Sequence, residues 1–199
     1  VNLFCHSNER LNQSIKDQLD KLEHVIFANF SHEPAIKVAE NVVKHAPEGL
    51  EKVFFADNGS SSVEIALKIS YQYHQQVGNH KKTKFLALKN AYHGETLGAL
   101  SMGDVDSFTE VFKPLLLNTY RANGPDCYRC PYKKKRETCQ AECFVHLEEL
   151  VEKNHEELCA IILEPLIQGA AGMKMYSPVY LKKVREICDR YDIHLIADE

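Results

Sequence analysis

Short apolar runs that alternate with helical patterns constrain the fold of this chain more than any other feature. Four such runs are predicted to be buried strands: Lys52–Ala56, Lys84–Leu88, Ala160–Glu164 and His194–Asp198. Elsewhere, apolar residues at spacings of three and four predict helices; these cover Asn8–Glu23, Glu33–His45, Ser61–Gln76 and a segment that starts at Ser177. Apolar strands separated by helices indicate an α/β domain with a mostly parallel sheet that is covered on both faces.

Length and charge exclude several classes of partner. The chain has 199 residues and a net charge of −4, so it can bury one sizeable core and has no basic surplus that would favour nucleic acid. No apolar run approaches the roughly 20 residues of a membrane-spanning helix. The first residues do not resemble a signal peptide, so we expect a cytoplasmic location. Because the chain lacks an initiator Met, we also expect it to begin inside a longer protein.

Glycine and hydroxyl residues follow the first predicted strand. Gly59, Ser60 and Ser61 lie at the start of the next helix, where backbone N–H groups lack partners and the helix dipole is positive. Glycine also permits close approach of a ligand to the backbone, so this segment is a candidate phosphate site. A serine that only caps the helix is the alternative.

Two more strand ends carry candidate binding groups. Tyr92-His93-Gly94 follows the second strand, where the aromatic ring can stack on a flat heterocycle or simply pack over the sheet edge. Asp198 ends the last strand behind Leu195–Ala197, and a carboxylate there needs a partner. A protonated ring nitrogen is one such partner, and a helix cap or a salt bridge is the alternative.

Taken together, these segments resemble the class-III aminotransferases of fold-type I, which use pyridoxal 5'-phosphate (PLP), over nearly the whole chain. The family's G-S-x-x-V-E-x-A-L-K segment matches Gly59–Lys68 and implies that Gly59, Ser60 and Ser61 hold the phosphate. Its Y-H-G implies that Tyr92, beside His93, stacks on the PLP ring and borders the substrate. Its E-P places Glu164 near the ring hydroxyl, and its D-E pairs Asp198 with the ring nitrogen.

The resemblance also implies an organisation. Residues 1–50 would be an N-terminal helical segment of the small-domain and interface region. Residues 51–199 would be the first part of the large PLP-binding domain, with a cysteine-containing insertion at 118–143. The family is homodimeric, and its Schiff-base lysine would follow Glu199. We therefore expect the chain alone to be inactive, and to be poorly soluble or partly unfolded.

Within the family, Gln168–Tyr176 and Leu22–Phe27 resemble one subgroup most. Its members transfer an amino group to 8-amino-7-oxononanoate and form 7,8-diaminononanoate in biotin synthesis, most of them with S-adenosylmethionine as donor. Another class-III ω-aminotransferase, acting on ornithine, a diamine or a γ-amino acid, stays open as an alternative.

Four of the seven cysteines, Cys127, Cys130, Cys139 and Cys143, cluster within 17 residues. Their spacing suits a zinc ion or an iron–sulfur cluster, so a metal-binding interaction module is a non-enzyme alternative. That alternative leaves the residues at the strand ends unexplained. Free thiols in a surface loop are therefore the favoured interpretation, and we predict no metal.

Overall fold

The computed structural model describes residues 3–199 and divides the chain into two compact units. The first ends at Phe55 and holds α1 (Glu9–Leu19) and α2 (Glu33–His45); of the predicted segment 1–50, Val1 and Asn2 lie outside the described residues. The Asn8 side chain caps α1 by accepting the N–H of Leu11 at 3.2 Å. No side chain of α1 is buried, and only Ala35 is buried in α2.

The second unit, from Ala56 to Glu199, contains a four-stranded sheet. Its strands lie in the order β2 (Tyr120–Ala122), β1 (Lys84–Leu88), β3 (Leu158–Leu163) and β6 (His194–Ala197), and every neighbouring pair is parallel. A separate antiparallel pair joins β4 (Ile167–Gln168) to β5 (Lys174–Met175). The predicted α/β class with a parallel sheet is confirmed.

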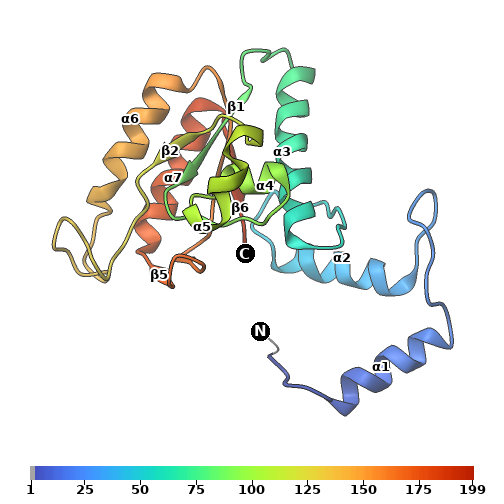
Figure 1. The fold of residues 1–199 in the computed structure, drawn as a ribbon. Helices are drawn as coiled ribbons and strands as arrows, with labels where there is room; N and C mark the ends of the chain where they lie inside the picture. The colour runs from blue at the N-terminus through green and yellow to red at the C-terminus, as the bar shows by residue number, and fades with distance from the viewer. Residues whose placement is uncertain (1–2) are drawn as a thin grey trace. The chain divides into compact units, whose positions relative to one another are not determined.

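Helices cover both faces of this sheet (Figure 1). On one face, Phe85 and Ala87 of β1 pack with α3 (Gly59–Gln76) and α4 (Leu97–Met102). On the other, Leu86 and Leu88 pack with α6 (Val145–Asn154) and α7 (Pro178–Tyr191). Successive side chains of a strand point to opposite faces, so one apolar run fills two cores. Three short helices complete the unit: α5 (Asp106–Thr109), η1 (Glu110–Leu115) and η2 (Glu142–Phe144).

One predicted strand is wrong. Lys52–Ala56 forms no strand, and Phe54 in the middle of it is 72% exposed. Among the described residues no strand lies beside this run, and an apolar run without a hydrogen-bonding neighbour cannot join a sheet. Conversely, β2 lies inside the segment 118–143, where we predicted a cysteine-containing insertion and no strand. Across residues 3–199, no helix is long and apolar enough to cross a membrane.

Candidate active site

The candidate site lies where the parallel strands of the second unit end. Because the four strands of the larger sheet run the same way, the residues that follow β1, β3 and β6 emerge at one edge of that sheet. These residues include Tyr92, His93, Glu164 and Asp198. Asp198 is fixed beside β3 by its own N–H, which donates to the Leu163 carbonyl at 2.9 Å.

The N-terminus of α3 presents free backbone donors. The helix begins at Gly59, and its cap is Asn58, whose side chain accepts the N–H of Ser61 at 2.9 Å. Within the described chain, the N–H groups of Gly59 and Ser60 have no acceptor. A Cβ added to Gly59 would meet nothing within 4 Å. The helix end is thus capped by an asparagine rather than a serine, and it still leaves two donors open to an anion.

Ser60 also connects this helix to the loop after β1. Its Oγ accepts the N–H of Glu95 at 3.1 Å. Gly94 lies directly against Ser60: an added Cβ would be 2.1 Å from the Oγ. Gly94 has a φ of +118°, a conformation that favours glycine. Two of the segments predicted separately, the helix start and the aromatic loop, therefore touch.

His93 and Asp198 form a pair at the end of β6. The distance from His93 Nδ1 to Asp198 Oδ2 is 2.8 Å. The His93 side chain is fully buried, whereas the Asp198 side chain is 27% exposed. The Nε2 atom of His93 is buried without a hydrogen-bond partner among the described residues. The imidazole therefore orients a carboxylate that still reaches the open edge of the site.

Tyr92 is held from two sides. Its backbone N–H donates to Glu164 Oε1 at 3.1 Å, and its hydroxyl donates to Glu95 Oε1 at 3.2 Å. Its ring lies 5.3 Å from that of Phe108. Partial burial, together with the nearby Glu95 carboxylate, raises the pKa of Tyr92. The phenol therefore stays protonated at neutral pH and acts as a hydrogen-bond donor.

Three residues of this arrangement were not among the predicted site residues. Asn58 could have been found, because Asn before a Gly-Ser segment is a favoured helix cap. Glu95 and Gln168 carry no such signal. Glu95 accepts the hydroxyl of Tyr92, and Gln168 donates to the Lys89 carbonyl, which lies 79 positions away in sequence. Only the folded sheet brings Gln168 to that carbonyl.

The arrangement fits PLP chemically. A phosphate needs clustered N–H donors, and α3 presents two that are unpaired. A protonated ring nitrogen needs a carboxylate, and Asp198 has one oxygen oriented by His93 and the other without a partner in residues 3–199. Of the predicted cofactor residues, Ser61 differs, because its N–H is already bound by Asn58.

The four clustered cysteines are free thiols between β2 and α6. Burial and the neighbouring thiols raise the pKa of Cys143 to about 11, and burial raises that of Cys127. Cys139 Sγ accepts the N–H of Ala141 at 3.2 Å. Throughout residues 3–199, no group of three or more His, Cys, Asp or Glu side chains is arranged to hold a metal ion.

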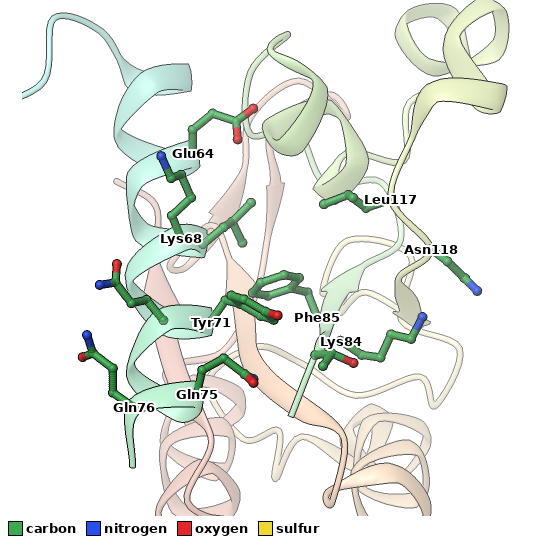
Figure 2. A pocket seen from close by; sticks show the side chains of 12 residues that line it. Glu64, Lys68, Tyr71, Gln75, Gln76, Lys84, Phe85, Leu117 and Asn118 are labelled. Atoms are coloured by element: carbon green, nitrogen blue, oxygen red, sulfur yellow. The ribbon is translucent and has the colours of Figure 1, made fainter. Parts of the chain in front are cut away.

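A cavity of about 690 Å³ lies apart from these residues, between α3 and β1. Figure 2 shows Lys68, Tyr71 and Gln75 along the α3 side and Phe85 opposite them. The lining includes Thr83 and Lys84, at the amino end of β1, and contains none of the predicted site residues. The cavity is therefore separate from the candidate active site.

Comparison with known proteins gives one family. The family model described as aminotransferase class-III matches residues 1–199. The adenosylmethionine-8-amino-7-oxononanoate aminotransferase of Geobacter sulfurreducens is 42% identical over 200 residues, which cover 100% of this chain and 44% of that protein. The enzyme of the same name from Helicobacter pylori is 43% identical and is covered to 43%. The chain thus spans less than half the length of these curated relatives.

Solved structures agree with this. The adenosylmethionine-8-amino-7-oxononanoate aminotransferase of Methanocaldococcus jannaschii superposes with a TM-score of 0.86 at 38% identity, covering 98% of this chain and 41% of that one. An amine transaminase from an uncultivated Pseudomonas species, solved with PLP bound, gives a TM-score of 0.88 at 33% identity, covering 98% and 44%. On sequence and fold alike, the chain belongs to the class-III aminotransferases.

Proposed function

We propose that the protein containing this chain is a PLP-dependent aminotransferase that converts 8-amino-7-oxononanoate to 7,8-diaminononanoate, with S-adenosylmethionine as amino donor. The observation that carries the PLP assignment is the convergence at one sheet edge of the open α3 N-terminus, Tyr92 and the His93–Asp198 pair. The substrate assignment rests on relatives named adenosylmethionine-8-amino-7-oxononanoate aminotransferase, which are about 40% identical over the whole chain.

The residues of the chain would hold PLP as follows. The free N–H groups of Gly59 and Ser60 bind the phosphate at the positive end of α3. Tyr92 stacks on the ring and borders the substrate. Asp198, oriented by His93, pairs with the ring nitrogen and keeps it protonated. PLP, when bound, would supply an electron sink next to the amino-bearing carbon of the substrate.

We also propose the domain division inferred from the sequence, with residues 1–50 as an N-terminal helical segment and 51–199 as the first part of the PLP-binding domain. A homodimer belongs to the same proposal, and the family resemblance supports it. A cytoplasmic location is proposed with it. A second candidate function is amine transamination with another donor, since the Pseudomonas amine transaminase has a TM-score of 0.88 against 0.86 for the Methanocaldococcus enzyme.

The test uses the full-length protein purified with PLP. Its visible absorbance should change to that of the pyridoxamine form on addition of S-adenosylmethionine and return on addition of 8-amino-7-oxononanoate. Conversion by lysine, ornithine or a diamine, but not by S-adenosylmethionine, would keep the cofactor and replace the donor. A protein that takes up no PLP would refute the proposal.

A further inference from the structure

Both carboxylate oxygens of Glu164 are already occupied by the protein backbone. Oε1 accepts the N–H of Tyr92 at 3.1 Å, and Oε2 accepts the N–H of Gly169 at 2.7 Å. The two donors come from different segments: Tyr92 follows β1, and Gly169 follows β4. Glu164 itself stands directly after β3, on the central part of the sheet. One side chain therefore connects two loops to a rigid strand.

Two further hydrogen bonds hold the same loops together. The buried Gln168 donates its Nε2 to the Lys89 carbonyl at 3.0 Å, which joins the start of the Tyr92 loop to β4. The hydroxyl of the buried Tyr176 donates to the Glu164 carbonyl, which anchors the end of the β4–β5 hairpin. The loop after β1 and the hairpin 167–175 are thus cross-linked at several points, with Glu164 at the centre.

We propose that Glu164 is a positioning residue, which sets the backbone of Tyr92 and of the 169–173 turn and does not itself bind the cofactor. This inference rests on the proposed function, because it assigns Tyr92 to the ring of PLP. It differs from the expectation that Glu164 lies on the ring's hydroxyl side as a ligand. A carboxylate that accepts two backbone N–H groups, one on each oxygen, holds both loops before any cofactor arrives, and each oxygen keeps a second lone pair.

The chemistry of the side chain makes the proposal specific. Two N–H donors converge on Glu164, and only a carboxylate offers an acceptor oxygen to each. Glutamine has nearly the same shape but one acceptor, so one of the two N–H groups would face an amide NH₂. Alanine offers none. The structure therefore predicts a graded loss of loop order, intermediate for Glu164→Gln and greatest for Glu164→Ala.

Backbone amide hydrogen exchange in the full-length, cofactor-free protein tests this without any catalysis. Glu164→Gln should speed exchange at Tyr92 or Gly169 by about tenfold or more, and Glu164→Ala should do so at both. Glu64→Ala is the matched control, since Glu64 Oε1 accepts the N–H of Gly98 at 2.6 Å. It should speed exchange at Gly98 and leave Tyr92 and Gly169 as in wild type.

A second readout separates positioning from cofactor contact. With PLP bound, Glu164→Gln should alter the visible circular dichroism of the cofactor, because the ring follows Tyr92, and should lower kcat more than it raises KM. If amide exchange at Tyr92 and Gly169 is unchanged in the near-isosteric Glu164→Gln, the proposal is overturned. Unchanged exchange together with weakened PLP affinity would identify Glu164 as a direct ligand of the cofactor. Since exchange is measured without cofactor or substrate, its result tests the role of Glu164 independently of the aminotransferase assignment.

Discussion

At the residue scale, the contact between Gly94 and Ser60 determines how the aromatic loop meets the start of α3. The φ of +118° at Gly94 disfavours any side chain, and a Cβ there would lie 2.1 Å from Ser60 Oγ and 2.9 Å from Ser60 Cα. Because the second distance involves backbone, the clash cannot be relieved by a rotamer change alone. The helix start that would hold the phosphate would have to move.

Gly94→Ala should therefore destabilise the full-length protein by about 2 kcal/mol or more, through backbone strain and the forced shift of Ser60. Gly172→Ala is the matched control, since its φ is +91° but an added Cβ meets nothing within 4 Å. Gly172→Ala should therefore lose only the part of the stability that backbone strain accounts for. Urea unfolding midpoints measure both variants, and equal losses would show that the Ser60 contact is unimportant.

The His93–Asp198 pair gives a second prediction at this scale. Asp198→Asn keeps the size of the side chain but removes the charge that would hold a protonated ring nitrogen. We expect kcat of the full-length enzyme to fall by about 100-fold or more. Asp189→Asn is the control, because Asp189 pairs with Arg185 on the surface of α7. Steady-state kinetics decide, and a loss of less than threefold at Asp198 would contradict its proposed role.

At the scale of elements, the sequence predicts helices with a sustained apolar periodicity and strands that form a clear apolar run. Glu33–His45 and Lys84–Leu88 have the predicted bounds, and α3 begins two residues earlier than predicted because Asn58, not a serine, caps it. The three-residue β2 escaped prediction because so short a strand has no readable alternation. Lys52–Ala56 was predicted wrongly because pairing is a tertiary property.

The same contrast applies to the candidate site. Residue type and position after a strand made Tyr92, His93 and Asp198 candidates, since parallel strands end at one edge, and the family resemblance gave them their expected roles. Which of them touch was not readable, because the partners lie about 100 positions apart, as for His93 and Asp198. Local sequence carries no information on such pairs.

The end of α3 contains a histidine that the fold keeps neutral. His74 is fully buried; its Nε2 donates to the Cys159 carbonyl at 3.1 Å, and its Nδ1 lies 3.5 Å from the Asn79 amide. The ring of His194 is 4.7 Å away, and Lys82 and Asp192 lie nearby. Burial lowers the pKa of His74 and of His194, and the proximity of His74 lowers the second further.

Acid should therefore destabilise the second unit. A histidine whose pKa is lower in the folded state binds more protons when unfolded, so its stabilising contribution is complete above about pH 6.5 and is lost as pH falls below that value. The slope is at most about 1.4 kcal/mol per pH unit for each proton. As the pH is lowered from 7.5 to 5, the urea midpoint of the wild type should decrease. The midpoint of His74→Gln should decrease less steeply. The exposed-site control His80→Gln should keep the wild-type slope; equal slopes in all three would contradict the prediction.

At the scale of the whole molecule, the two units differ in how much apolar surface they bury. The second has clusters of fully buried side chains on both faces of its sheet, for example Leu86 and Ile162. In the first, the apolar side chains of α1 form a stripe of Leu11, Ile15 and Leu19, which are 46%, 60% and 57% exposed. A stripe at helical spacing is typical of a face that packs against protein. The chain also spans only 44% of the Geobacter sulfurreducens relative.

We expect this α1 stripe to be covered in the proposed full-length homodimer and open in residues 1–199 alone. Ile15→Ser should then cost the full-length protein about 2 kcal/mol, which is the free energy of burying such a side chain. The adjacent Lys16→Ser, at a residue exposed in the same helix, should leave the stability of the full-length protein nearly unchanged. Thermal unfolding of the full-length wild type and of the two variants makes the comparison. An effect of Ile15→Ser as small as that of Lys16→Ser would mean that the stripe stays in water in the complete enzyme, and that the exposed face of α1 has no structural partner.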